Sequence, residues 1–383
     1  MAQSRNSHMD VGAFSGPEGP ESIQAQGKSR FTRILVVMPN WVGDVVMATP
    51  ALRALRERFA DAHIGLLLKG HLAEILNGGI WMDEVIHWPA GKGKSRPKRR
   101  QGFLGLAAEL RDRQFDLAVL LANSFRSALL ARLAGIRRRV GYDRDGRGML
   151  LTDRLLPAKV HGNYLPMPMV DYYNAVAKYL GCRDCSQEME LHTTPEEEST
   201  AQQAIKYAAV RVDQPIVVLN PGASFGSAKC WPAERFAEVG DKLVTGFKAA
   251  IFVSCAPNEI DIAQKVADNM RQPVTVLNKP VMKLGPSKAL IRSASLLITN
   301  DTGPRHFAKA LGTPVVTIFG PTDPRWSSNK CPTERCLMVK VDCGPCMKRE
   351  CPVDHRCMTR ITSDLVFEQA RELLKDRIAV AVK

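Results

Sequence analysis

Short, uninterrupted apolar runs alternate with helix-like segments along most of the chain, and this alternation constrains the fold more than any other feature. Arg33 to Met38 (RILVVM) is the first run, and Leu52, Leu55 and Phe59 then recur at helical spacing. Strands that lack polar alternation are buried on both faces, which is typical of parallel sheets covered by helices. Further strand-like runs are 63–68, 84–87, 116–122, 215–219, 249–254, 273–277, 296–299 and 314–319. The sequence therefore predicts an α/β protein.

The alternation is interrupted once, between residues 181 and 213. Thr194-Pro195 and the three glutamates after it have the pattern of a helix start. We therefore predict two Rossmann-like domains that face each other across a cleft, where ligands of open α/β folds bind. The predicted divisions are a disordered segment at 1–30, an N-terminal domain at 31–180, a linker at 181–213, a C-terminal domain at 214–360 with a Cys-rich insertion at 331–357, and a last helix at 361–383.

The chain is strongly basic, with 53 Lys and Arg residues against 39 Asp and Glu residues. This excess predicts an anionic partner. Nucleic acid is not expected, because aromatic residues are only 6% of the chain and do not interleave with the basic clusters. No apolar stretch reaches the roughly 20 residues of a membrane-crossing helix, and none resembles a secretory signal. We expect a cytoplasmic protein.

Asp44 is the first candidate for chemistry, because it follows the first strand within Asn40-Trp41-Val42-Gly43-Asp44. A carboxylate at the carboxyl end of a sheet can act as a general base toward a sugar hydroxyl. The alternative is an ordinary turn or capping aspartate. The segment is not the G-x-G-x-x-G pattern of a dinucleotide fold, which argues against a dehydrogenase.

A second candidate site follows the first strand of the second half. Gly222 and Ser224 lie in a loop of small residues, and Lys229 comes shortly before a helix. Backbone N–H groups and a lysine together can bind a phosphate, although a solvated surface lysine is the alternative. The loop lacks the spacing and the ending of a Walker A motif, so hydrolysis of a nucleoside triphosphate is not expected.

The third candidate segment follows the strand at 296–299. Asp301 and Thr302 can cap the next helix, whose free N–H groups would face a diphosphate together with Gly303. His306 either binds the ligand or packs under the loop. Glu259 could accept hydrogen bonds from ribose hydroxyls, or it is an ordinary glutamate at a helix start.

Four segments of the chain resemble the bacterial ADP-heptose:lipopolysaccharide heptosyltransferases (glycosyltransferase family 9), most closely those of type II. The resemblance runs from about residue 33 to 325. It implies a GT-B fold, with the acceptor on the N-terminal domain and the nucleotide sugar on the C-terminal domain. The segments are MPNWVGDVVMATPALRALRERF, ANSFRSALLARLAGIRRRVGY, NPGASFGSAKCWPAERFAEV and TNDTGPRHFAKALGTPVVTIFGPTDP.

The same resemblance implies an inverting transfer of L-glycero-D-manno-heptose from ADP-heptose to the heptosyl-Kdo2-lipid A inner core. Asp44 then falls on the family's catalytic base, Lys229 on its phosphate-contacting lysine and Glu259 on its ribose-binding glutamate. The diphosphate loop falls on residues 301–303. No cofactor is implied, and no D-x-D pair stands where it could hold an essential metal.

The heptosyltransferase hypothesis suggests functions for two basic clusters. Asn123, Ser124 and Arg126 could contact the acidic sugars of a phosphorylated lipid A core. The run from Lys92 to Arg100 could hold the enzyme at the anionic inner face of the inner membrane, or it is only a solvated loop. The Lys92 to Arg100 run is the first of the two basic clusters. The second cluster, which includes the Arg126 named above, comprises Arg126, Arg132, Arg137, Arg138, Arg139, Arg144 and Arg147.

The cysteines depart from the family pattern. Cys343, Cys346, Cys351 and Cys357 lie close together, with His355 among them. In a cytoplasmic chain this spacing leaves three interpretations open: a structural zinc or Fe–S site, paired cysteines, or free thiols.

Three hypotheses about function stay open at this point. The leading one is the heptosyltransferase. The second is an enzyme of the same family with another sugar or acceptor. The third is a non-catalytic scaffold that binds a sugar nucleotide or a metal, because architecture does not fix function. A redox role of Cys343 and Cys346 is less favoured, because no thioredoxin-like βαβ context surrounds them.

Overall fold

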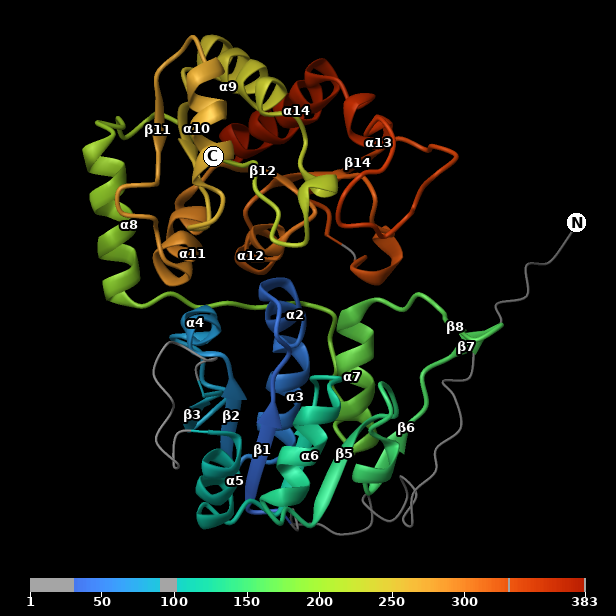
Figure 1. Ribbon diagram of the computed structural model, residues 1–383. Coiled ribbons are helices and arrows are strands. Elements are labelled where there is room, and N and C mark those ends of the chain that lie inside the picture. The colour runs from blue at the N-terminus through green and yellow to red at the C-terminus, as the bar shows by residue number, and fades with distance from the viewer. Residues whose placement is uncertain (1–30, 90–101, 330, 382–383) are drawn as a thin grey trace, which may run out of the picture. The chain divides into compact units, whose positions relative to one another are not determined.

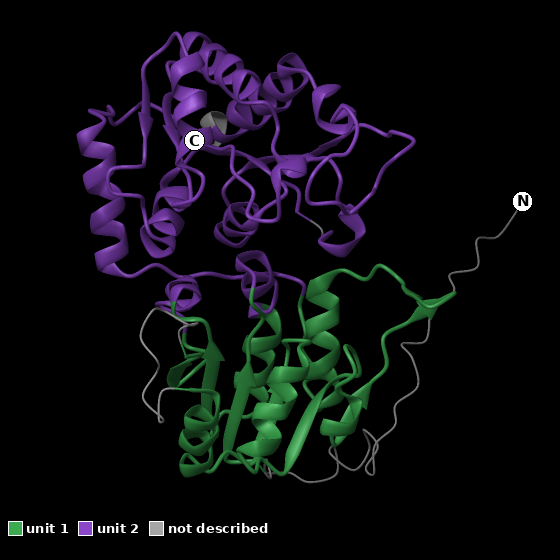
Figure 2. Cartoon of the chain, viewed as in Figure 1, with its two compact units in different colours: residues 1–40, 50–70, 80–186 green, residues 41–49, 71–79, 187–383 purple. Residues whose placement is uncertain are grey.

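The computed structural model describes residues 31–89, 102–329 and 331–381. The chain divides into two compact units (Figure 2). Unit 1 comprises residues 1–40, 50–70 and 80–186, and unit 2 comprises 41–49, 71–79 and 187–383. The segment predicted to be disordered and the basic run from Lys92 to Arg100 lie outside the described residues.

Unit 1 contains a six-stranded parallel sheet in the order β3-β2-β1-β4-β5-β6 (Figure 1). The central strands are buried on both faces, as uninterrupted apolar sequences require. The strands are β1 (Arg33–Val37), β2 (His63–Leu68), β3 (Glu84–His87), β4 (Leu117–Leu120), β5 (Arg138–Tyr142) and β6 (Asp153–Leu155), with a small hairpin of β7 (Lys159–Val160) and β8 (Asn163–Tyr164).

Unit 2 contains a second six-stranded parallel sheet, in the order β11-β10-β9-β12-β13-β14. Its strand order repeats that of unit 1. The strands are β9 (Ile216–Asn220), β10 (Ala250–Val253), β11 (Val274–Val276), β12 (Leu296–Asn300), β13 (Val315–Phe319) and β14 (Glu334–Met338). The predicted α/β class and every apolar run predicted as a strand are confirmed.

Helices connect most consecutive strands of the two sheets, as parallel pairing requires, whereas short 3-10 turns lie between β5 and β6 and between β13 and β14. The helices before residue 190 are α2 (Val42–Met47), α3 (Thr49–Arg58), α4 (Gly70–Ala73), α5 (Phe103–Asp112), α6 (Phe125–Leu133) and α7 (Met169–Tyr179). Those after it are α8 (Pro195–Tyr207), α9 (Ala233–Phe247), α10 (Ile260–Asn269), α11 (Leu284–Ser293), α12 (Gly303–Leu311), α13 (Arg356–Thr359) and α14 (Ser363–Ala381). The short 3-10 turns are η1 (Glu74–Leu76), η2 (Gly148–Leu150), η3 (Ser227–Lys229) and η4 (Pro324–Trp326).

Three further segments belong to unit 2. Helix α8, in the predicted linker, begins with a capping box between Thr194 and Glu197 and packs on α11 of unit 2. Residues 334–338, within the predicted Cys-rich insertion, form β14 and complete the second sheet. The last helix contributes Val366 and Leu374 to the core of unit 2. Within the described residues, no helix has both the length and the apolar character to cross a membrane.

The repeated strand order decides where the candidate residues lie. In each sheet the first and fourth strands in chain order are neighbours, and the chain continues from them toward opposite sides of the sheet. Ligands of such folds bind at this switch point, outside the carboxyl ends of the two strands. In unit 1 these strands are β1 and β4, whose following segments carry Asp44 and Asn123. In unit 2 they are β9 and β12, whose loops carry Gly222 and Asp301. Residues far apart in the sequence are therefore brought to the carboxyl end of the same sheet, at equivalent positions in the two units.

Candidate active site

A cavity of about 570 Å³ lies beyond the carboxyl end of β9 in unit 2. We call it the β9 cavity. Gly222, Ser224 and Glu259, three of the predicted donor-site residues, line it together with Ser227 and Lys265. A Cβ at position 222 would come within 2.1 Å of a carboxylate oxygen of Glu259, so any larger residue there would displace the glutamate carboxylate. The glutamate side chain therefore lies directly over the backbone of this loop.

Glu259 is held in place by its own turn. Its Oε2 accepts a hydrogen bond of 3.0 Å from the backbone N–H of Ala256, and the residue occupies the N-cap position of α10 without a capping hydrogen bond from its side chain. The helix-start interpretation of this glutamate is therefore correct as a description of local structure. Its position in the β9 cavity also leaves it available to a ligand.

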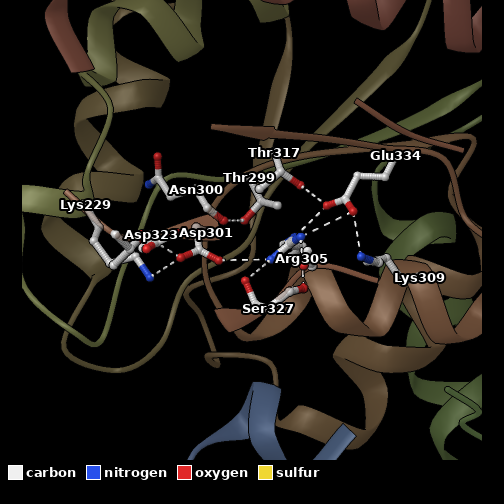
Figure 3. A network of polar contacts seen from close by, with 12 residues as sticks. Lys229, Thr299, Asn300, Asp301, Arg305, Lys309, Thr317, Asp323, Ser327 and Glu334 are labelled. Atoms are coloured by element: carbon white, nitrogen blue, oxygen red, sulfur yellow. Dashed lines mark hydrogen bonds and ion pairs between the residues drawn. The ribbon is translucent and has the colours of Figure 1, made fainter. Parts of the chain in front are cut away.

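Lys229, between the cavity-lining residues Ser227 and Cys230, belongs to a chain of buried charges (Figure 3). Lys229 Nζ donates to Asp301 Oδ2 at 2.7 Å, and Arg305 Nη1 donates to Asp301 Oδ1 at 3.2 Å. On its other side, Arg305 pairs with Glu334, which also accepts from Lys309 Nζ at 2.6 Å. We call these five residues the charge network. Three cations and two anions leave it with one net positive charge at neutral pH.

Burial and pairing determine the protonation of this network. Burial alone would raise the pKa of Asp301, but the charges of Lys229 and Arg305 outweigh it and hold the pKa well below its ordinary value. Burial opposes ionisation of Glu334 too, yet Arg305 and Lys309 lower its pKa to about 2. Both carboxylates are therefore ionised at neutral pH. Lys229 is a nearly buried ion-pair partner, so the alternative of a solvated surface lysine is wrong.

Asn300 ties the loops of the site together. Its amide donates to the carbonyl of Pro221 at 2.7 Å, and its Oδ1 accepts from the backbone N–H of Trp231 at 3.1 Å. The last residue of β12 thus fixes the loop after β9 and the segment that follows Lys229. Thr322 adds a hydrogen bond of 2.8 Å to Asp301 Oδ2.

The N-terminus of α12 lies close to α2 within unit 2. A Cβ on Gly43 would come within 2.7 Å of the His306 ring, and one on Gly303 would meet Val42 at 2.6 Å. The two glycines therefore allow the first turns of both helices to approach. Thr302 is the N-cap residue of α12, although its side chain makes no capping hydrogen bond.

His306 is buried under this helix start. Burial, followed by the charges of Arg305 and Lys309, lowers its pKa to about 3, so the imidazole is neutral at physiological pH. Within the described chain, its Nδ1 has no hydrogen-bond partner. His306 therefore packs under the loop, which is one of the two expected arrangements. Its contact with a ligand stays a prediction.

Asp44 lies in the first turn of α2, directly after β1. Its side chain is only partly buried. Because α2 packs on α12, the candidate base and the diphosphate loop belong to neighbouring helix starts. Its role as a base stays a prediction.

The three predicted acceptor residues have different surroundings. Ser124 caps α6, its Oγ accepting from the Ser127 N–H at 3.2 Å. Arg126 is exposed and lies over the rings of Trp88 and Phe103. Asn123 is partly buried and is hydrogen-bonded within the unit.

The second basic cluster is not one solvated surface. Arg138 and Arg139 lie in β5, where Arg138 pairs with Asp153 at 2.7 Å and Arg139 donates to the Leu150 carbonyl at 2.7 Å. Arg147 is fully buried. Arg147 is therefore closed to an anionic partner, and Arg138 and Arg139 are engaged within unit 1.

The Cys-rich segment braces the loop that carries Lys229. The Ala228 N–H donates to the Arg349 carbonyl at 2.9 Å, and His355 Nε2 lies 2.7 Å from the Ala228 carbonyl. Gly226 is required there, because a Cβ would come within 2.3 Å of the Arg349 carbonyl oxygen. The segment therefore supports the candidate phosphate site from behind.

The four cysteines line a second cavity, of about 100 Å³, together with His355. All ten cysteines are free thiols, so the alternative of paired cysteines is not what the structure has. Over the described residues, no group of three or more His, Cys, Asp and Glu side chains is arranged to hold a metal ion. A zinc or Fe–S site formed by Cys343, Cys346, Cys351 and Cys357 stays a prediction.

Sequence reasoning missed Arg305, Lys309 and Glu334. Arg305 stands four residues after Asp301, a spacing that places an ion pair on one helix face, and this signal could have revealed it. Glu334 had no such signal, because it reaches Arg305 only through the pairing of β13 with β14.

Two six-stranded parallel sheets of identical strand order, covered by helices, match the GT-B fold of solved heptosyltransferases. A solved family 9 glycosyl transferase from Veillonella parvula DSM 2008 aligns with a TM-score of 0.76 and 24% identity, over 90% of this chain and 97% of that one. The structure of E. coli ADP-heptose lps heptosyltransferase II aligns with a TM-score of 0.73 and 24% identity, over 90% and 99%.

The sequence comparisons agree with this architecture. The family described as glycosyltransferase family 9 (heptosyltransferase) matches residues 103–356. Lipopolysaccharide heptosyltransferase 2 of Escherichia coli (strain K12) is 29% identical over 353 residues, which cover 89% of this chain and 98% of that protein. The chain belongs to glycosyltransferase family 9, the heptosyltransferases.

Removing the charge of Glu334 should destabilise unit 2 strongly. Glu334→Gln leaves Arg305 and Lys309 buried with one carboxylate fewer, and breaking a buried pair costs about 3 kcal/mol or more. Chemical denaturation measures the loss. Glu350→Gln, at an exposed position, is the matched control. A loss no larger than that of the control would contradict the role of the network.

The protein should become less stable as the pH falls below about 6.5, partly because of His306. Its pKa is about 3 in the folded chain and about 6.5 when unfolded, so the unfolded state binds the proton first. This contribution to stability is complete above pH 6.5 and is lost progressively toward pH 3. Denaturation of His306→Gln should show a shallower decline over this window than the exposed control His71→Gln. Equal slopes would contradict the assignment.

Proposed function

We propose that this family 9 enzyme transfers L-glycero-D-manno-heptose from ADP-heptose to the heptosyl-Kdo2-lipid A inner core, with inversion at the anomeric carbon. The observation that carries the proposal is the β9 cavity beside the charge network. A cavity with an ordered glutamate suits a nucleoside, and neighbouring buried cations suit its diphosphate.

The donor site follows from these contacts. Glu259 would accept hydrogen bonds from the ribose hydroxyls, while Gly222 and Ser224 line the path of the nucleotide. Lys229 and the N–H groups of Thr302 and Gly303 at the start of α12 would face the diphosphate. Lys229 already neutralises Asp301, so the net positive charge of the whole network attracts the diphosphate.

Catalysis would use Asp44 as the general base. It removes the proton from the acceptor hydroxyl as that oxygen attacks the anomeric carbon, opposite the departing ADP. The bond from the anomeric carbon to the diphosphate oxygen breaks, and the electron pair leaves with ADP. Lys229 and the helix start stabilise the negative charge that develops there. No step in this mechanism uses a metal or another cofactor.

The acceptor would be a phosphorylated lipid A core at the inner face of the inner membrane. The similarity to lipopolysaccharide heptosyltransferase 2 of Escherichia coli supports this choice. Arg126 is exposed and could contact acidic groups of the acceptor. We accordingly propose a cytoplasmic enzyme that associates peripherally with the anionic membrane surface.

Replacing the proposed base should abolish transfer without affecting donor binding. Asp44→Asn keeps the size of the side chain but removes its basicity, so transfer should fall by at least about 100-fold. ADP release in the presence of lipid A core acceptor measures the reaction, and calorimetry with ADP measures binding. The exposed Asp61→Asn is the control. A folded Asp44→Asn enzyme with near-normal turnover would reject Asp44 as the base.

Glu259 should contribute to nucleotide affinity. Glu259→Gln keeps the shape but loses the charged acceptor of the ribose hydroxyls, so the Kd for ADP should rise about ten-fold, or about 1.4 kcal/mol. Calorimetry measures this change. Glu57→Gln, exposed in unit 1, should bind ADP like the parent. Unchanged affinity of the Glu259 variant would place the nucleoside elsewhere.

A further inference from the structure

The side chain of Asn123 is fixed in one orientation at the carboxyl end of β4. Its Oδ1 accepts two hydrogen bonds, one from Arg147 Nη2 at 3.1 Å and one from the Tyr172 hydroxyl at 3.0 Å. An amide rotated by half a turn would direct its NH2 group at the guanidinium of Arg147, which has donors only. The carboxamide therefore keeps its oxygen inward and its two N–H donors on the other side.

Arg147, which donates to Asn123, is also held by hydrogen bonds to backbone carbonyls. It is fully buried, and its other N–H groups donate to the carbonyls of Tyr142 and Leu120 at 2.9 and 3.4 Å, and also to the Ala122 carbonyl. Gly141 leaves room for it, because a Cβ there would come within 3.1 Å of Nη2.

Arg147 remains a cation although its hydrogen-bond acceptors are neutral oxygens. Burial lowers the pKa of the guanidinium only to about 10, so it is protonated at neutral pH. In the described part of the chain it forms no salt bridge, and its hydrogen-bond acceptors are carbonyl, amide and hydroxyl oxygens. It therefore serves to order the segment after β4.

Tyr172 supplies the second inward donor. Its ring stacks on Tyr142 with centroids 3.8 Å apart, and burial raises its pKa to about 12, so the hydroxyl keeps its proton. Stacking fixes the ring, and the ring fixes the hydroxyl against Asn123. Arg147, in the segment after β5, thus decides the amide orientation, and Tyr172 of α7 adds a second hydrogen bond to the same oxygen.

The outward side of Asn123 is partly exposed, at the switch point between β1 and β4. We propose that Asn123 is a specificity-determining residue that donates a hydrogen bond to an oxygen of the sugar acceptor, with Arg147 and Tyr172 as its positioning residues. This inference rests on the proposed function. A fixed NH2 group recognises a hydroxyl, carboxylate or phosphate oxygen and offers nothing to a hydrogen-bond donor.

Asn123→Asp separates this role from a merely structural one. A carboxylate still accepts from Arg147 and Tyr172, so folding should be preserved, but it has no outward donor. The kcat/KM for the lipid A core acceptor should fall about 10- to 100-fold, as expected for a lost hydrogen bond to a polar or charged group. The Kd for ADP should not change. Asn163→Asp, exposed in unit 1, is the matched control.

Tyr172→Phe gives a second, milder test. It removes only the hydroxyl that orients Asn123, so the KM for the acceptor should rise several-fold while kcat and ADP affinity stay near the parent values. Unchanged acceptor kinetics in both variants would overturn the inference, and so would unfolding of Asn123→Asp, since its inward contacts are retained. Failure of the parent enzyme to transfer heptose, despite binding ADP, would instead reject the proposed function.

Discussion

The buried charge network holds the candidate site together. Asp301 cannot be buried as an anion without Lys229 and Arg305, and Arg305 cannot be buried without Glu334. These residues come from a 3-10 turn, a loop, a helix and an edge strand. Because an uncompensated buried charge is costly, all four elements must be in place together, which fixes the Lys229 loop relative to the start of α12.

The two units order equivalent loops by different means. Both sheets have the same strand order and place functional candidates after their first and fourth strands. In unit 2, the ion pairs of the charge network order the loops at the carboxyl end of the sheet. Unit 1 uses one buried guanidinium, Arg147, whose partners are neutral oxygens. The difference suits the proposed ligands, since a diphosphate needs positive potential whereas a sugar needs oriented hydrogen-bond donors.

The strands that the sequence predicted are those with uninterrupted apolar residues. β5 and β14 were missed, because Arg138, Arg139 and Glu334 interrupt the apolar pattern and find their polar partners only in the folded chain. The helix start at Thr194 was predicted correctly, since a capping box involves only residues three apart. Elements specified by residues close together in the sequence were therefore predicted, whereas strands that depend on distant polar partners were not.

The sequence by itself determined the α/β class, most strands and the loops in which candidate residues lie, because hydrophobic periodicity and capping depend on neighbours along the chain. The resemblance in four segments determined the family. Only the tertiary structure decided that Lys229 is paired, that His306 is neutral and that Arg147 is buried behind Asn123. These properties depend on contacts between residues far apart in the sequence, such as Lys229 with Asp301, His306 with Gly43 and Arg147 with Asn123, whose distances are set by strand order and packing rather than by spacing.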